Sequence, residues 1–155
     1  MSGKTHFYET AVIWTGNRGD GTASYQAYGR DHILRVSGKS DLALSSDPAF
    51  RGDGSKFSPE ELFVASLASC HMLWYLHLCA DAGIVVIAYE DHAEATMTET
   101  EPGRFEAVVL HPRVILAKGD PQAAEVLHED AHRKCFIANS VNFPVSCEPK
   151  VIRGE

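Results

Sequence analysis

Residues 58–83 read SPEELFVASLASCHMLWYLHLCADAG, and this stretch carries the clearest helix signals in the chain. Ser58 and Glu61 have the spacing of a capping box, in which each side chain binds a backbone N–H at the other residue. Pro59 stands at the first helical position, where its missing N–H costs nothing. Gly83 suits the left-handed residue that ends a helix. The stretch therefore predicts one long helix.

The predicted helix has no charged face. No Lys, Arg, Asp or Glu occurs between residues 62 and 80, whereas a surface helix carries charged residues along one side. We therefore expect the helix to be buried nearly all round, either wrapped by sheet or shared with a second subunit. Cys70 lies in the middle of it, between Ser69 and His71.

An apolar stretch of this length also fits a helix that spans a membrane. That reading would place His71 and His77 in the hydrocarbon, and the stretch carries carboxylates at both ends. Strand-like segments before and after it would also be parted by the bilayer. We therefore expect a core helix and no membrane partner.

Length, composition and charge fit one globular domain over residues 1–155. The net charge of −7 and the lack of a basic run argue against binding of nucleic acid. Residues 1–10 contain no apolar signal core, which favours a cytoplasmic protein.

Three strands and a loop are expected before the helix. Residues 5–14 are rich in β-branched and aromatic side chains, which favours a strand. Residues 22–28 and 32–36 read as a hairpin, and residues 37–57 read as a loop rich in Ser, Asp, Gly and Pro.

Sheet dominates after the helix as well. Residues 84–100 and 105–117 read as the long arms of a hairpin, and a second helix begins at Asp120 and Pro121. An apolar stripe along that helix ends at a cysteine: Ala124, Leu127, Ala131 and Cys135. Residues 143–151 alternate as a last strand. The element order predicts an α+β fold with mostly antiparallel sheet.

The four cysteines form no CxxC pair. Cys79 and Cys147 are interpreted as small buried hydrophobic residues. Cys70 differs because its own helix offers no cation to favour a thiolate, so a partner must come from elsewhere in the chain or from another chain.

No metal site is expected. Cys70 and His77 share a helix face but lie about 10.5 Å apart along it, too far to ligate one zinc ion. His128 and His132 have the i, i+4 spacing of a metal pair, but without an HExxH pattern they are interpreted as a solvated face.

Three sites along the chain resemble the family of osmotically inducible protein C (OsmC) and organic hydroperoxide resistance (Ohr) proteins. The segment that leads to the family's first cysteine is similar to residues 58–70, where five positions match: Pro59, Glu60, Leu62, Ala65 and Cys70. The family's second cysteine, near the end of a later helix, corresponds to Cys135 after Ala131 and His132. Its loop arginine corresponds to Arg18.

The resemblance implies an OsmC/Ohr-like fold, with mostly antiparallel sheets wrapped around a central buried helix in an intertwined homodimer. It also implies a thiol peroxidase that reduces organic hydroperoxides. In such a protein Cys70 attacks the peroxide, and Cys135 closes a disulfide with it. A dithiol, such as a dihydrolipoyl group, then reduces the disulfide, and no bound cofactor is needed.

Supporting roles follow from the same resemblance. Arg18 would favour the Cys70 thiolate and orient the peroxide, while Glu60 would hold Arg18. Glu60 and Cys70 lie about 15 Å apart along one helix, so one arginine cannot touch both from one direction. We therefore expect two chains to share each active site. Apolar side chains around Cys70 would suit an alkyl or lipid-like substrate: Phe63, Leu73, Trp74 and Phe136.

The chain departs from the family pattern at two places. His71 follows the first cysteine where Phe is common, and Phe136 follows the second where Pro is common. Two alternatives remain: a binding protein that has kept the fold without turnover, and another thiol enzyme that pairs Cys70 with His71 or His77. Neighbouring residues on a helix do not face each other, so Cys70 and His71 make a poor dyad.

Overall fold

A computed structural model describes residues 3–155 of the chain. The chain divides into two compact units, one up to Leu62 and one from Phe63 to Glu155. Each unit is described by itself below.

The first unit is built on a small antiparallel sheet. Its strands are β1 (Ala11–Trp14), β2 (His32–Arg35) and β3 (Leu42–Leu44), in the order β1-β2-β3. A short 3-10 helix, η1, covers Pro48–Phe50. The strand expected at residues 5–14 is therefore confirmed only at its end, and the loop expected at residues 37–57 contains β3.

The strand predicted at residues 22–28 is wrong. This segment forms successive turns, closed by hydrogen bonds from Ala23 N–H to the Asp20 carbonyl and from Ala27 N–H to the Ser24 carbonyl. Tyr25 and Tyr28 do not line a sheet face, because their rings lie 4.4 and 4.0 Å from the Arg30 guanidinium. β2 pairs with β1 instead of forming the predicted hairpin.

The long helix α1 (Pro59–Asp81) has the predicted ends. Ser58 N–H donates to the Glu61 carboxylate at 2.9 Å, and Glu61 N–H donates to the Ser58 hydroxyl at 3.2 Å, which confirms the capping box. At the other end, Gly83 has φ +70°, a left-handed conformation that glycine adopts readily.

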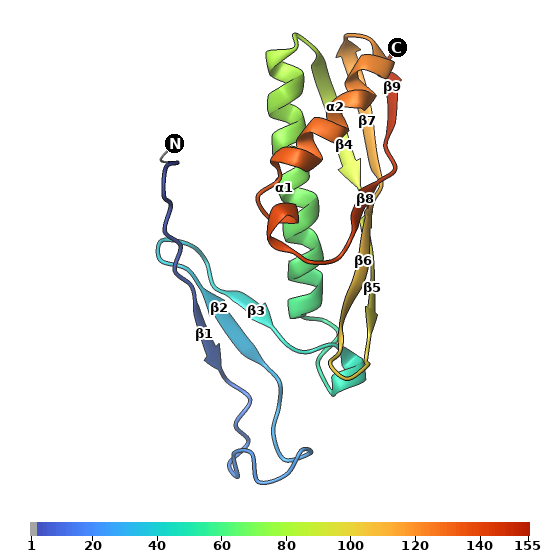
Figure 1. Cartoon of the computed structure of the whole chain (residues 1–155). Helices are drawn as coiled ribbons and strands as arrows, with labels where there is room; N and C mark the ends of the chain where they lie inside the picture. The colour runs from blue at the N-terminus through green and yellow to red at the C-terminus, as the bar shows by residue number, and fades with distance from the viewer. Residues whose placement is uncertain (1–2) are drawn as a thin grey trace. The chain divides into compact units, whose positions relative to one another are not determined.

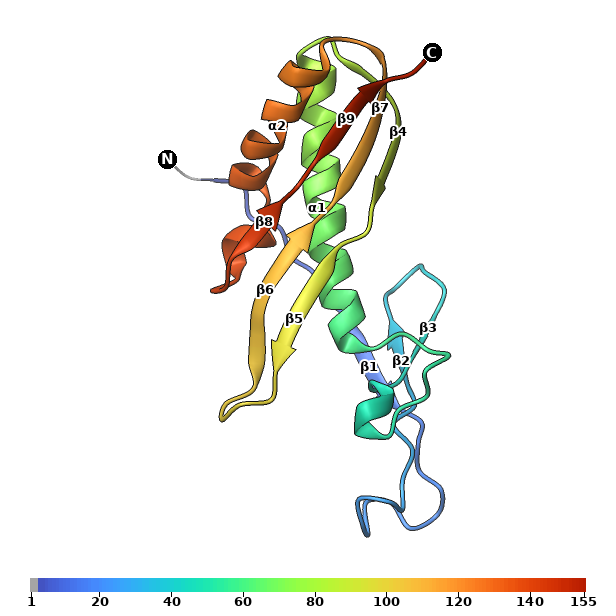
Figure 2. The same ribbon diagram turned by 90° about the vertical axis from the view of Figure 1, so that its right-hand side faces the viewer.

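Two three-stranded sheets and a second helix complete the second unit (Figures 1 and 2). The elements in chain order are β4 (Val85–Asp91), β5 (Glu94–Thr98), β6 (Arg104–Leu110), β7 (Pro112–Lys118), α2 (Pro121–Lys134), η2 (Ala138–Ser140), β8 (Val145–Cys147) and β9 (Lys150–Arg153). One sheet has the order β4-β7-β9 and the other β5-β6-β8. The pairs β6–β8 and β7–β9 are parallel and the rest antiparallel, which confirms an α+β fold with mostly antiparallel sheet.

Each predicted long arm is divided into two strands that belong to different sheets. Asp91 ends β4, and its carboxylate accepts the His111 N–H at 2.7 Å. Pro112, which has no N–H to donate, begins β7 directly after His111. These residues let the ribbon pass from one sheet to the next.

In the single chain, α1 is buried along one face, and cover of its remaining faces by a second subunit stays a prediction. The buried residues recur every four positions: Leu67, His71, Tyr75 and Cys79. Both helices lie on the same side of the two sheets (Figure 2), so within the second unit no further layer covers the side of α1 that faces away from the sheets. On that side Leu73 is 61% exposed.

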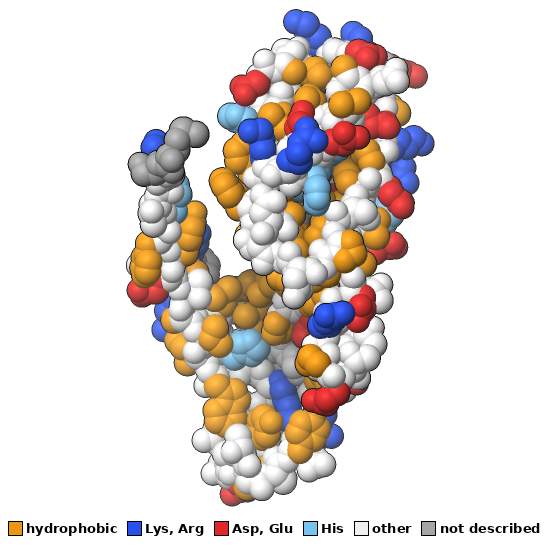
Figure 3. Space-filling model, in the orientation of Figure 1, with side chains coloured by type: hydrophobic (Ala, Val, Ile, Leu, Met, Phe, Trp, Pro, Cys, Tyr) orange, Lys and Arg blue, Asp and Glu red, His pale blue; other side chains and the backbone are white. Residues whose placement is uncertain are grey.

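Apolar side chains are also open on the surface elsewhere in both units (Figure 3). Of the described helices, α1 alone is long and apolar enough to cross a membrane. Because the core helix of a globular protein meets the same criteria, this is weak evidence for a membrane span.

Candidate active site

Cys70 lines a pocket of about 290 Å³ on the side of α1 where Leu73 is exposed, called the open side below. The other lining residues come from the same helix and from the segment after α2: Leu73, Trp74, His77 and Phe136. Phe136 is 69% exposed, so the pocket opens to solvent. Three of the four side chains predicted around the substrate thus lie beside Cys70.

Phe63, the fourth, lies elsewhere. Its ring packs against Phe105 and Phe143, with centroids 5.1 and 5.8 Å away. Phe63 stands seven residues before Cys70, which separates the two by about 10.5 Å along the helix. It therefore belongs to an aromatic cluster under the β5-β6-β8 sheet and is removed from the pocket.

A cation that the sequence did not point to lies beside Trp74, one of the residues that line the pocket. Trp74 and Phe136 pack edge to face with centroids 5.5 Å apart. The Lys134 ammonium lies 5.4 Å from the centre of the Trp74 ring. A cation over an indole face is attracted by the ring's quadrupole. Lys134 immediately precedes Cys135, and this position next to a candidate redox cysteine is the one feature of the sequence that could have suggested a role for it.

Cys135 ends α2 and is 1% exposed. Its sulfur accepts the Ala138 N–H at 3.4 Å. Burial raises the pKa of Cys135 to about 11, and the adjacent Cys70 thiol adds to the rise. The structure therefore brings the two predicted redox cysteines of the second unit together.

Arg18 lies in the first unit, on an exposed loop after β1. The Asn17 side chain shapes this loop by accepting the N–H groups of Gly19 and Gly21 at 2.9 and 3.1 Å. Gly29 N–H donates to the Gly16 carbonyl at 2.8 Å, and a side chain at Gly16 would collide with Gly29. The loop is thus well defined, and the pairing of Arg18 with Glu60 and Cys70 stays a prediction.

Glu60 is the second residue of α1. One of its carboxylate oxygens, Oε2, is buried and has no hydrogen-bond partner among residues 3–155. A buried oxygen of this kind is costly unless a donor reaches it. The position is therefore suited to pairing with a cation.

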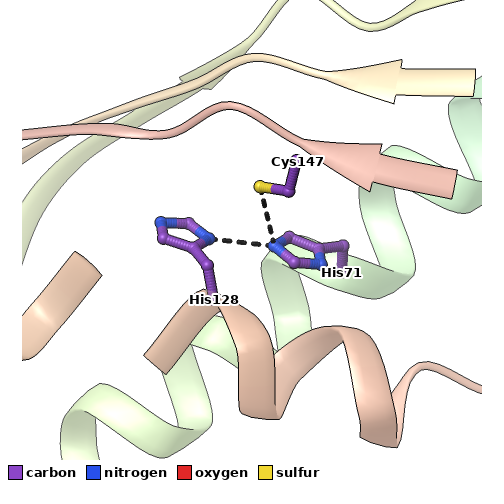
Figure 4. A group of neighbouring side chains, drawn as sticks. All are labelled: His71, His128 and Cys147. Atoms are coloured by element: carbon purple, nitrogen blue, oxygen red, sulfur yellow. Dashed lines mark hydrogen bonds between the residues drawn. The ribbon is translucent and has the colours of Figure 1, made fainter. Parts of the chain in front are cut away.

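A second group of reactive side chains lies in the core, where none was predicted. His71 Nε2 and His128 Nδ1 are 2.9 Å apart, and the Cys147 sulfur is 3.7 Å from His71 Nε2 (Figure 4). The three residues come from α1, α2 and β8. The Tyr75 ring stacks on His128 at 3.8 Å.

The interpretation of His128 as part of a solvated face is therefore wrong. His128 is 3% exposed, while His132 is exposed as expected. His128 lies on the same helical stripe as Ala124, Ala131 and Cys135, and this spacing was a signal that could have placed it inside.

Burial sets the ionisation of this core group. It lowers the pKa of His71 to about 4, with a smaller contribution from His132. It lowers the pKa of His128 to about 3, with His71 adding to the shift. Burial also raises the pKa of Cys147 to about 12, followed by the effects of Asp91 and Glu148. At neutral pH the three side chains are uncharged when nothing is bound.

The fold and the two neighbouring thiols define a class: an α+β protein with a two-cysteine pocket beside its long helix. The sequence model of the family described as OsmC-like protein matches residues 52–150, and the chain therefore belongs to the OsmC family.

Solved structures agree with this assignment. An OsmC-like protein of unknown function from Vibrio cholerae is 31% identical, with a TM-score of 0.84 over 94% of this chain and 100% of the other. An organic hydroperoxide resistance protein OsmC from Legionella pneumophila is 20% identical, with a TM-score of 0.64 over 95% of this chain and 98% of the other. An organic hydroperoxide resistance protein from Elizabethkingia anophelis is 17% identical, with a TM-score of 0.66 over 97% and 100%. No curated protein sequence matches the chain.

Proposed function

We propose that this protein is a thiol-dependent peroxidase that reduces organic hydroperoxides, alkyl or lipid, to alcohols. The observation that carries the proposal is the apolar, solvent-open pocket at Cys70 with a second thiol, Cys135, beside it. Leu73, Trp74 and Phe136 offer an apolar surface to the organic part of the substrate.

The reaction takes three steps. The Cys70 thiolate attacks the peroxide O–O bond, which breaks to give a Cys70 sulfenic acid and, after protonation, the alcohol. The Cys135 thiol then attacks the sulfenic sulfur, forming the disulfide and releasing water. An external dithiol, of the lipoyl type, reduces this disulfide by exchange and is itself oxidised to a disulfide.

The environment of Cys135 supports its assignment as the second cysteine in this sequence. Burial raises its pKa to about 11, and it sits at the carboxyl end of α2, where a helix disfavours negative charge. Cys135 is therefore a thiol at neutral pH and a weak nucleophile toward peroxide. Cys70, on the open side, is the thiol that a substrate can reach.

The proposal includes a homodimer with shared active sites. The far side of α1 exposes apolar side chains such as Leu73, and Glu60 keeps a buried oxygen without a partner among the described residues. A second chain would cover this side and bring its Arg18 and Glu60 to Cys70, with each Arg18 pairing with the Glu60 carboxylate of its own chain. Light scattering tests this point: a monomer of 17.0 kDa at micromolar concentration would contradict it.

Two features disfavour the other thiol chemistries. His71 Nε2 is directed at His128 and Cys147, so it is not a base for Cys70. His77 lines the Cys70 pocket but pairs with Asp81 at 3.3 Å. It stands two turns from Cys70, beyond the reach of a direct hydrogen bond.

Peroxide consumption tests the function and separates an enzyme from a binding protein that has lost turnover. Cumene hydroperoxide and a fatty-acid hydroperoxide are supplied with either a dihydrolipoyl system or a thioredoxin system. We expect multiple turnovers with the dihydrolipoyl system. Failure of both systems with both peroxides, by protein whose Cys70 is fully reduced, would contradict the proposal.

A further inference from the structure

The core group formed by His71, His128 and Cys147 has the geometry of a metal site. The imidazole nitrogens and the sulfur all lie within 4.8 Å of one another. Tetrahedral zinc, with bonds of about 2.0–2.1 Å to nitrogen and about 2.3 Å to sulfur, places a nitrogen and a sulfur about 3.6 Å apart. The observed separation of His71 Nε2 and the Cys147 sulfur is 3.7 Å. The two nitrogens, at 2.9 Å, need to part only slightly.

Hydrogen bonding alone satisfies this group poorly. A bond between two neutral imidazoles uses two of their four nitrogens. His71 Nδ1 and His128 Nε2 are both buried without a hydrogen-bond partner in the part of the chain that the structure describes. Burying two imidazoles for one hydrogen bond is costly. Metal ligation by the facing nitrogens supplies a much stronger interaction that offsets this cost.

The three donors are also held in advance. They come from α1, α2 and β8, so each is fixed by a different element of the core (Figure 4). Tyr75 stacks on the His128 ring at an interplanar angle of 9° and keeps it from turning. Preorganised ligands of this kind require little rearrangement when an ion arrives.

An opening to solvent reaches the same group. His128 and Cys147 line a pocket of about 400 Å³ whose other residues include Glu129 and His132. A metal ion can enter by this route, and a fourth ligand can be drawn from it. Three protein ligands plus one exchangeable ligand is the arrangement of catalytic zinc sites, whereas structural sites have four protein ligands.

We propose that His71, His128 and Cys147 bind one zinc ion, with the fourth position open to a water molecule or a small ligand from the adjoining pocket. Two imidazoles and one thiolate are ligands that suit zinc and exclude magnesium or calcium. This site is separate from the Cys70 pocket and does not depend on the proposed peroxidase activity.

Charges around the site fit a bound cation. Cys147, held as a thiol by burial, gives up its proton to solvent when the ion binds, which leaves the site with one net positive charge. The Asp91 and Glu148 carboxylates lie near enough to Cys147 to affect its ionisation. Asp91 Oδ2 is buried without a partner among the described residues, so a positive site nearby would also stabilise this carboxylate.

Cobalt(II) as a spectroscopic substitute for zinc tests the site in the full chain with Cys70→Ser and Cys135→Ser, which removes the proposed redox thiols. We expect one equivalent to bind, with visible bands of tetrahedral cobalt and a thiolate-to-cobalt charge-transfer band. Adding Cys147→Ser should abolish the charge-transfer band, whereas His77→Ala, at an exposed histidine of the same helix, should leave it intact. A charge-transfer band that survives Cys147→Ser, or no binding at all, would overturn the proposal.

X-ray absorption of the zinc-loaded protein gives an answer that does not depend on variants of the core. After dialysis with equimolar zinc and excess magnesium, we expect one zinc per chain with one sulfur and two imidazole ligands. A shell without sulfur, or with two or more sulfurs, would contradict this ligand set.

Discussion

Cys70 and His71 are neighbours on α1, yet their surroundings have nothing in common. Cys70 faces the open side of the helix, among apolar side chains that reach solvent. His71, turned by about 100° on the helix, is 1% exposed and faces His128 and Cys147 in the core. One turn of sequence thus supplies an accessible thiol and a buried ligand.

The difference bears on what each side of α1 can do. A substrate must enter and a product must leave, so turnover needs the open side. A bound ion needs donors held in fixed positions, and the buried side of α1 provides them. His71 thus cannot be interpreted as a partner of Cys70 merely because it follows it.

The largest expected effect is that of Cys70→Ser on peroxide consumption. Removing the attacking sulfur should lower the rate on the order of a thousandfold or more, because the remaining groups only position the substrate. Cys79→Ser serves as the matched control, since Cys79 is buried in the core and takes no part in the proposed reaction. Steady-state rates with cumene hydroperoxide check this, and comparable losses in both variants would contradict the role of Cys70.

Cys135→Ser should separate the first step from the second. The variant should still reduce one equivalent of peroxide and then stop, because the Cys70 sulfenic acid has no second thiol to attack it. A dimedone adduct on Cys70, measured by mass, records the trapped acid. Continued turnover at the wild-type rate would show that Cys135 is not the second cysteine.

Arg18→Ala should act on the open side alone. The pH profile for alkylation of Cys70 should move to higher pH, because a nearby cation favours the thiolate. Glu60→Gln should give a smaller shift in the same direction, since Glu60 is proposed to act only by positioning the arginine. Arg35→Ala is a matched control, because Arg35 is exposed and pairs with Asp41 on the same unit. An unchanged profile in Arg18→Ala would contradict the proposal that Arg18 activates the Cys70 thiol.

The smallest effect concerns the buried side of α1 and its dependence on pH. His71 and His128, with pKa values near 4 and 3, stay neutral in the folded protein while an unfolded histidine protonates below about pH 6.5. The unfolded state then binds more protons, so stability is full above about pH 6.5 and falls toward about pH 4. Each histidine steepens this fall by up to about 1.4 kcal/mol per pH unit.

Denaturation of chelator-treated protein between pH 7 and pH 4 measures this slope. His128→Asn should reduce the slope, whatever it does to stability at pH 7. His6→Asn, at an exposed histidine, serves as the control. An identical slope in His128→Asn would mean that His128 titrates alike in the folded and unfolded states.

Local signals in the sequence predicted the helices well. The capping box at Ser58 and the N-cap at Asp120 depend on side chains a few residues apart, and both are confirmed. The strand predicted at residues 22–28 does not form. Tyr25 and Tyr28 contact the Arg30 guanidinium instead, and strand propensity does not take such contacts into account. The sequence did not predict that each long arm would be divided into two strands, because the division depends on a contact between Asp91 and His111, twenty residues apart.

The site was predictable to the extent that it follows one helix. Leu73 and Trp74 stand within about one turn of Cys70, and the structure places both in its pocket. The core group was missed because His71, His128 and Cys147 are brought together only by packing across three elements. Their places on the apolar stripes of α1 and α2 were the only hint.

The cysteine that Cys70 joins after oxidation tests the central claim most directly. The reduced wild-type protein is treated with one equivalent of cumene hydroperoxide, alkylated, digested and analysed by mass spectrometry. The account predicts one dominant disulfide between Cys70 and Cys135, with Cys79 and Cys147 recovered as alkylated thiols. A dominant link from Cys70 to either of those two cysteines would contradict it.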